Sequence, residues 1–271
     1  MRVNVNKFKQ RYRYAIILLR ELVITDFKLR YQNSFLGYLW SLLKPMALFT
    51  ILYFVFVRFL RIGGDLPHFP VYLLLGIVIW TYFGEVTNGS VGAIVGKGDL
   101  LRKINFPKYV IVLAGSFSAL INLAINLLVV LIFMVITKTP FMETVLWVPL
   151  LIVELFVFAL SVAFLLSALF VKLRDINHIW EVVMQGAFYA TPILYPVSIL
   201  PETAAKILML NPIAQIVQDL RYAAITHETA TIGTVYGSEW SRLIPLGMVA
   251  VLAVLAAWYF KRRSRYFAEE I

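Results

Sequence analysis

The sequence predicts an all-α polytopic membrane protein, a single transmembrane domain with six membrane-spanning helices over residues 1–271. Hydrophobic residues make up 61% of the chain and its mean hydropathy is +0.82, whereas only about half of the residues in a soluble domain are apolar. A helix needs about 20 predominantly apolar residues to cross a bilayer. Segments that meet this requirement lie at about 41–60, 71–95, 109–137, 144–171, 176–196 and 243–260.

The distribution of Lys and Arg predicts that both termini lie in the cytoplasm. Of these 25 residues, 18 lie in the N-terminal stretch, the 96–108 loop, the 172–175 loop and the C-terminal tail. Loops that stay in the cytoplasm are enriched in Lys and Arg, so this bias fixes the orientation of the spans. The net charge of +10 therefore indicates contact with anionic membrane lipids rather than with nucleic acid.

The N-terminal segment 1–34 has a helical pattern of its own. Between Arg13 and Lys28, apolar residues such as Leu18 and Leu22 share one face, and charged residues such as Arg20 lie opposite. A helix of this kind is expected to lie flat at the cytoplasmic membrane surface. The alternative, that this basic N-terminal segment is only partly ordered, stays open at this point.

The segment 176–196 is the least regular of the predicted spans. It carries Glu181 and Gln185 and is broken at Thr191-Pro192, where proline removes a backbone hydrogen bond. We therefore expect a re-entrant stretch from Pro192 onward, within an outer gate region at 197–242.

Two short helices are expected inside this outer region. Asn211-Pro212 is typical of a helix start, with Asn as the N-cap and Pro in the first turn. Pro201-Glu202 suggests a second start. The predicted helices cover 201–209 and 212–225, and a polar loop is expected at 226–241.

The residues that could carry out catalysis are sparse. The chain has no cysteine, and its three histidines lie in separate loops without metal-ligand spacing. The Gly96–Asp99 tetrad resembles a short pattern of intramembrane aspartyl proteases, but those enzymes need a second intramembrane aspartate, which the predicted spans lack. We expect no enzymatic activity, no metal site and no bound cofactor in this chain.

Polar and aromatic residues within the spans admit two interpretations. Glu85 and Glu154 interrupt apolar helices, either as a polar lining or as hydrogen-bonding partners between helices. Aromatic clusters could anchor the helices at headgroup level or line a passage in which sugar rings stack. The aromatic residues concerned are Trp80, Tyr82, Phe83, Phe188, Tyr189 and Tyr195.

Five ordered motifs resemble the membrane subunit of bacterial type-2 ABC exporters of cell-surface polysaccharide, the family for O-antigen, capsule and teichoic acid. The first motif lies at the start of span one and the others follow in order over nearly the entire chain. They are Arg30, Tyr31, Ser34, Leu36, Gly37, Trp40 and Pro45; Leu101 to Pro107; Arg174 to Ile176; Thr191 to Tyr195; and Asn211-Pro212.

The resemblance implies a multi-pass homodimeric channel in the bacterial cytoplasmic (inner) membrane. It also implies two copies of a cytoplasmic ABC ATPase as partners. These ATPase subunits, and not this chain, would bind ATP and Mg²⁺. The cargo would be a glycan or teichoic acid polymer on a lipid carrier, usually undecaprenyl pyrophosphate.

By motif position, the segment 97–107 would couple the chain to the ATPase, and aromatic, acidic and basic residues would line the path. The coupling residues would be Lys97, Asp99, Leu101, Arg102, Lys103, Asn105, Phe106 and Pro107. The path residues would be Trp80, Tyr82, Phe83, Glu85, Tyr189, Tyr195, Arg58 and Arg61, although snorkelling to the outer headgroups also explains the two arginines.

Two other functions are weighed against this one. A type-2 permease for drugs or small lipids would share the fold, but the motif that begins at Arg30 and the Ile104–Pro107 segment argue against it. A membrane enzyme acting on lipid-linked sugars would need a carboxylate or His constellation at one membrane face, which the sequence does not offer.

Overall fold

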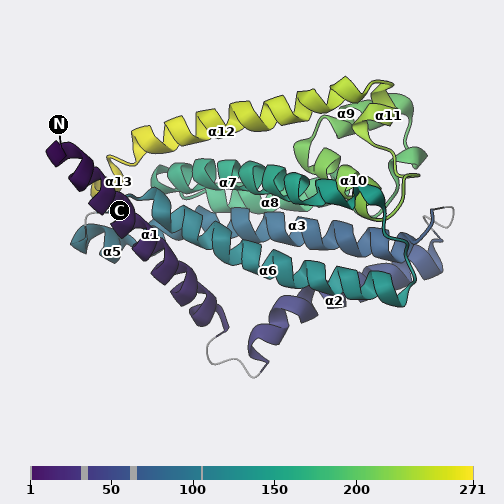
Figure 1. Ribbon diagram of the computed structural model, residues 1–271, viewed down its shortest axis with the longest axis horizontal. Coiled ribbons are helices and arrows are strands. Elements are labelled where there is room, and N and C mark those ends of the chain that lie inside the picture. The colour runs from purple at the N-terminus through teal and green to yellow at the C-terminus, as the bar shows by residue number, and fades with distance from the viewer. Residues whose placement is uncertain (1, 32–35, 62–65, 105, 271) are drawn as a thin grey trace.

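The computed structural model describes residues 2–31, 36–61, 66–104 and 106–270, and in these ranges the regular structure is entirely helical. Figure 1 shows long helices running side by side, with the N- and C-termini near one end of the molecule and short helices at the other. The end that holds the termini is called the terminal end below, and the opposite end is called the distal end.

Five helical segments are long and apolar enough to cross a membrane, which confirms five of the six predicted spans. They are Gly37–Phe59, Phe69–Val91, Tyr109–Ile136, Glu143–Lys172 and Glu239–Arg263. Their elements are η1 (Gly37–Leu39), α2 (Trp40–Leu52) and η2 (Tyr53–Phe59); α3 (Phe69–Val91); α6 (Tyr109–Ile136); η3 (Glu143–Trp147) and α7 (Val148–Lys172); and η5 (Glu239–Arg242) and α12 (Leu243–Arg263).

The sixth predicted span, 176–196, is helical only in α8 (Ile176–Ala190), which has 15 residues. At 1.5 Å per residue such a helix covers about 22 Å, less than the hydrocarbon thickness of about 30 Å. Thr191 has extended backbone angles, and Pro192 follows. The break at Thr191-Pro192 therefore ends the helix before it reaches the length of a span.

Helix α3 forms the centre of the bundle and packs against α6, α7, α8 and α2. Most of its residues from Phe69 to Val91 are buried. The facing helices present small buried residues, which let helix backbones approach closely in membrane proteins. These are Ala114, Ser116, Ser118 and Ala119 on α6, and Ala159, Ser161, Ala163, Ser167 and Ala168 on α7.

The two short helices expected in the outer region are confirmed as α9 (Glu202–Met209) and α10 (Pro212–Ala224). Asn211 caps α10, because its side-chain oxygen accepts a hydrogen bond from the Ile213 N–H at 3.2 Å. A 3₁₀ turn, η4 (Val197–Ile199), precedes them.

The expectation of a polar loop over 226–241 is wrong in part. This stretch forms α11 (Ile232–Tyr236) and the start of η5. Thr231 and Thr234 make a reciprocal capping box, which satisfies N–H groups that a helix start leaves unpaired. The second residue of this box is Thr rather than the usual Glu or Gln, which hides the signal in the sequence.

A buried arginine joins the distal short helices to the bundle. The Arg221 side chain of α10 is fully buried and donates to the carbonyls of Tyr72, Pro192 and Ile193 and to Gln218 Oε1. Its guanidinium carbon lies 3.5 Å from the centre of the Tyr72 ring. Burial lowers the pKa of Arg221 to about 10, so the side chain stays cationic at neutral pH. Arg221 therefore satisfies carbonyls that the break after α8 exposes.

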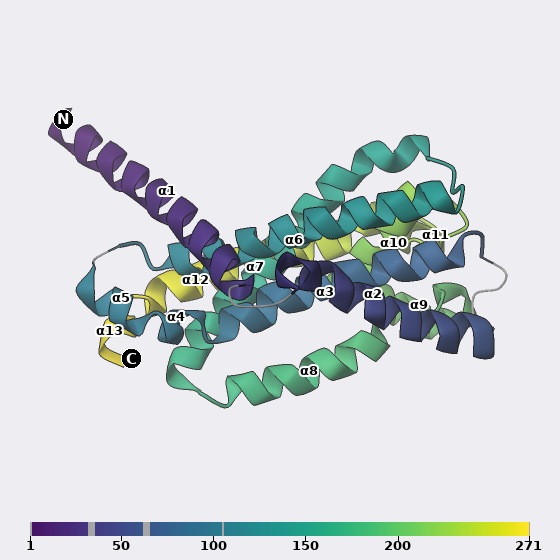
Figure 2. The same ribbon diagram turned by 90° about the horizontal axis from the view of Figure 1, so that it is seen from below.

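At the terminal end, the N-terminal segment is a single helix, α1 (Arg2–Tyr31), which packs against α6. The short helices α4 (Ala93–Gly96), α5 (Gly98–Lys103) and α13 (Phe267–Glu270) gather at the same end. Figure 2 shows α1 running obliquely away from the bundle. The predicted helix is confirmed, while its place on a membrane surface stays a prediction.

Candidate functional site

A cavity of about 760 Å³ lies between α2, α3, α6 and α8. Aromatic side chains, amides and one carboxylate share its lining. The residues are Trp40, Ser41, Lys44, Pro45, Leu48, Trp80, Thr81, Gly84, Glu85, Asn88, Gly89, Asn122, Asn126, Met184, Gln185, Phe188 and Tyr189. We call it the central cavity.

Two asparagines of α6 build the polar wall of the central cavity. Asn122 Nδ2 donates to Glu85 Oε1 on α3 at 2.7 Å. Asn126 Nδ2 donates to the carbonyls of Asn122 and Ser41, at 2.8 and 3.3 Å. Both asparagines are buried and lie four residues apart, hence on one face of the helix. Glu85 is thus a hydrogen-bonding partner between helices and also part of the lining.

Aromatic rings form the other wall. The Trp80 ring meets Phe188 of α8 edge-on at 5.7 Å between centroids, and Phe188 meets Tyr189 at 5.3 Å. Trp40 and Tyr189 are 51% and 67% exposed, so their faces remain accessible. Rings beside amides and a carboxylate suit carbohydrate, because sugar C–H faces pack on aromatic rings while sugar hydroxyls need hydrogen-bonding partners.

The other predicted path residues lie outside the central cavity. Tyr82 and Phe83 are buried in the core, and Phe83 stacks on Phe158 of α7 at 5.4 Å. Tyr195 lies nearby and donates to the Tyr189 carbonyl at 3.1 Å.

The two arginines proposed for the path are both exposed, near the distal end of the first span. The guanidinium of Arg58 lies 5.9 Å from the Tyr53 ring centre. Arg61 follows η2 and has a positive φ of 52°. Neither arginine lines the central cavity.

Several lining residues escaped the sequence analysis, chiefly Asn88, Asn122, Asn126 and Lys44. The signal available for two of them was the pair of amides spaced four residues apart within a 28-residue apolar helix. Polar residues at such spacing mark an interhelical or cavity-facing stripe.

The predicted motif at the start of the first span is described only in part. Trp40 lines the central cavity, Pro45 is buried inside α2, and Gly37 adopts a positive φ of 50°. Ser34 lies outside the described residues, as do the side chains of Arg30 and Tyr31, which end α1.

The predicted coupling segment forms the short helix α5 and its flanks. Asp99, Arg102 and Lys103 are exposed, whereas Leu101 and Phe106 are buried and hold the segment on the bundle. Lys97 and Pro107 are half-buried, and Asn105 lies outside the described residues.

Two lysines tie the coupling segment to the chain termini. Lys97 Nζ lies 2.9 and 3.0 Å from the two carboxylate oxygens of Asp26 on α1. Lys108 Nζ donates to the Ser264 carbonyl at 2.6 Å, and burial lowers the pKa of Lys108 against the attraction of Glu269. A displacement of this segment would therefore reach both α1 and the C-terminal tail.

Long apolar helices around a polar, aromatic cavity define the broad class of membrane transport proteins. A family model described as ABC-2 type transporter matches residues 17–225. The O-antigen export system permease protein RfbA of Myxococcus xanthus is 31% identical over 270 residues, which cover 97% of this chain and 98% of the relative.

Two further relatives are similar over most of their lengths. A Klebsiella pneumoniae protein, also named O-antigen export system permease protein RfbA, is 29% identical to this chain. The matched region covers 85% of this chain and 93% of the relative. Polysialic acid transport protein KpsM of Escherichia coli is 24% identical, and the matched region covers 77% of this chain and 81% of the relative. The chain belongs to the ABC-2 type transporter family, as the sequence motifs predicted. Membership implies an ATPase partner.

Proposed function

We propose that this chain is the channel-forming permease of an ATP-driven exporter that moves lipid-linked polysaccharide across the cytoplasmic membrane. The observation that carries the proposal is the central cavity, whose lining combines the rings of Trp40, Trp80 and Tyr189 with the amides of Asn122 and Asn126. The names of the relatives, O-antigen export permease and polysialic acid transport protein, support a polymeric glycan as cargo. The carrier we propose is undecaprenyl pyrophosphate.

The proposal includes a homodimer. Helices α2 and α8 border the central cavity and expose large apolar side chains beside it, among them Leu43, Leu48, Ile179, Val182 and Tyr189. Such apolar surface alone would face lipid, but the polar groups of the adjoining cavity would be unstable in contact with lipid. We therefore infer that a second copy covers the cavity and completes a channel. In this arrangement α8 and the chain through Pro196 supply the sixth crossing, and both termini are cytoplasmic.

The ATPase, in two copies, binds ATP and Mg²⁺ and acts on the exposed face of α5. Arg102 and Lys103 offer charges there, and Leu101 and Phe106 transmit displacement to the core in which they are buried. The lysine contacts to Asp26 and Ser264 extend the same movement to α1 and the tail.

The experiment replaces the chromosomal gene with variants and measures surface polymer and its lipid-linked precursor inside the cell. Loss of the chain should remove surface polymer and accumulate precursor. The double substitution Trp40→Ala and Tyr189→Ala removes two lining rings whose faces are accessible. It should lower export about tenfold, because stacking worth roughly 1.4 kcal/mol corresponds to a factor of ten.

The matched control is Trp240→Ala, since Trp240 is an exposed aromatic residue of η5 outside the central cavity. This variant should export normally. If deletion of the chain leaves surface polymer unchanged, or if the cavity variant exports as well as the control, the proposed function is wrong.

A further inference from the structure

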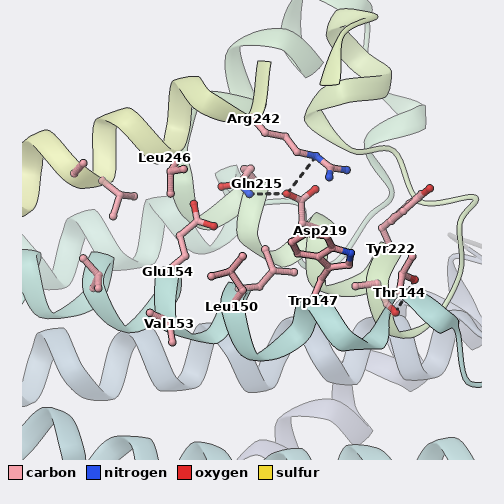
Figure 3. Close-up of a pocket in the computed structure, with 15 residues that line it drawn as sticks. Thr144, Trp147, Leu150, Val153, Glu154, Gln215, Asp219, Tyr222, Arg242 and Leu246 are labelled. Carbon is pink, nitrogen blue, oxygen red and sulfur yellow. Dashed lines mark hydrogen bonds and ion pairs between the residues drawn. The ribbon is translucent and has the colours of Figure 1, made fainter. Parts of the chain in front are cut away.

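A second cavity, of about 460 Å³, lies at the distal end between η3, α7, α10 and α12 (Figure 3). We call it the lateral cavity. Its walls are mainly apolar, with Leu150, Val153 and Val157 from α7 and Leu246 and Val249 from α12. The long apolar surface between two membrane-spanning helices suits a hydrocarbon chain.

Four polar side chains from three elements meet at one side of the lateral cavity: Glu154 of α7, Gln215 and Asp219 of α10, and Arg242 of η5. Gln215 Nε2 donates to Asp219 Oδ2 at 2.6 Å. Arg242 Nε lies 4.0 Å from the same oxygen and 3.3 Å from Glu239 Oε2 at the rim. Together with Glu239, the cluster therefore holds three carboxylates and one guanidinium.

The cluster has more buried acceptors than donors. In the described part of the chain, three buried acceptors, Glu154 Oε1, Gln215 Oε1 and Asp219 Oδ1, have no hydrogen-bond partner, and one buried donor, Arg242 Nε, makes only the ion pairs named above. Gln215 and Asp219 are only 3% and 5% exposed. Buried polar atoms in native proteins almost always have hydrogen-bond partners, so these three acceptors indicate a ligand that supplies N–H groups.

The charges at the site point to the same kind of ligand. Burial raises the pKa of the Asp219 carboxyl above its ordinary value, although the hydrogen bond from Gln215 and the charge of Arg242 oppose the shift. An additional cation would stabilise the ionised carboxylate. A diphosphate-bearing carrier, in contrast, would bring negative charge to a site that already has an excess of it.

We propose that the lateral cavity is a binding site for an ethanolamine phospholipid. The primary ammonium donates to Glu154, Gln215 and Asp219, the phosphate lies toward Arg242 at the rim, and an acyl chain follows the groove between α7 and α12. This inference requires that the chain lies in a membrane, as members of its family do. It does not depend on which cargo the chain exports.

The test uses Trp147, which lines the lateral cavity, as a reporter. The full-length chain is purified in detergent, delipidated and titrated with phospholipids whose acyl chains carry bromine, which quenches nearby tryptophan. The quenching lost in Trp147→Phe belongs to this site. Phosphatidylethanolamine should bind about tenfold more tightly than phosphatidylcholine, whose ammonium has no N–H to offer the buried acceptors. Phosphatidylglycerol, which is anionic, should bind more weakly still.

The variants Glu154→Gln and Asp219→Asn keep the side-chain volumes and should remove the preference for phosphatidylethanolamine. Their matched control is Glu143→Gln, an exposed carboxylate of η3 outside the lateral cavity, which should leave the preference unchanged. Ala250→Phe, which adds a ring to the wall of the cavity, should weaken quenching at Trp147 by all three lipids without adding a second tryptophan to the site.

Equal binding of the three headgroups would overturn the proposal in favour of an unspecific apolar groove. If no lipid quenches Trp147, the proposal is wrong, and bound water rather than a lipid pairs with the three buried acceptors. The comparison among lipids needs only the unaltered protein and Trp147→Phe, so it remains decisive if a variant of the polar cluster or of the cavity wall fails to fold. The titration involves neither cargo nor ATP, so a failed export experiment with intact lipid selectivity would count against the proposed function alone.

Discussion

The distal end and the terminal end of the molecule are each stabilised by a different kind of interaction. At the distal end, the fully buried Arg221 joins α10, α3 and the turn after α8 through four hydrogen bonds. At the terminal end, α1 is tied to the coupling segment by Lys97 and Asp26, whose side chains are 25% and 26% exposed. Buried networks enforce one arrangement, whereas a partly exposed ion pair contributes less and rearranges more easily. The comparison indicates a rigid distal end and a terminal end that can move.

The largest expected effect comes from Arg221→Met, which removes the centre of the distal network. The substitution leaves the carbonyls of Tyr72, Pro192 and Ile193 without their donor, and buried unpaired groups cost about 1–3 kcal/mol each. We expect a loss of several kcal/mol in stability, measured as thermal unfolding in detergent. Arg262→Met, at an exposed arginine of α12, should cause almost no change. If both variants melt alike, the distal network does not stabilise the fold.

A smaller effect is expected from Gly76→Ala in α3. A methyl group at this position would overlap the guanidinium of Arg221, so that α10 must shift, at a cost of about 1–3 kcal/mol. Gly89→Ala in the same helix is the matched control, because the described residues place no heavy atom within 4 Å of its added carbon. The control should be neutral or slightly stabilising, since alanine is the better helix former. A lower melting temperature for Gly89→Ala than for Gly76→Ala would contradict this account.

The smallest effect on stability is expected from Asp26→Asn at the terminal end. An ion pair of this exposure contributes at most about 1 kcal/mol, so the melting temperature should barely change. Export should nevertheless fall, because α1 is no longer tied to the coupling segment. The charge exchange Asp26→Lys with Lys97→Asp should restore part of the export rate. Unchanged export in Asp26→Asn would remove this pair from the proposed transmission.

The sequence predicted the spans well because length and hydrophobicity alone decide them. For the segment 176–196 it predicted a break at Thr191-Pro192, and α8 does end at Ala190, directly before this break; that the segment crosses the membrane stays a prediction. The capped start of α10 was predictable from Asn211-Pro212. Helix α11 was not, because a Thr–Thr capping box lacks the usual acidic partner.

The candidate site was harder to predict than the fold. Trp80, Glu85 and Tyr189 were expected to line the path and do lie around the central cavity. Tyr82 and Phe83 were grouped with Trp80 by proximity in sequence. Tyr82 points away from Trp80, because residues two apart in a helix differ by about 200°. Phe83, whose ring lies 5.9 Å from the Trp80 ring, packs on Phe158 in the core. The partners Asn122 and Asn126 come from another helix, and only tertiary packing brings them to Glu85.

The central claim is that this chain is moved by an ATPase that contacts α5, and charge reversal on that helix tests it most directly. The double variant Arg102→Glu and Lys103→Glu is to be co-expressed with the partner ATPase, and ATP-dependent export measured in proteoliposomes together with co-purification of the two subunits. The control reverses Arg262 and Arg265, which are exposed cations near the same end. Our account predicts a folded, membrane-inserted variant that loses the ATPase or its coupled export, while the control retains both. Full export by the α5 variant would contradict it.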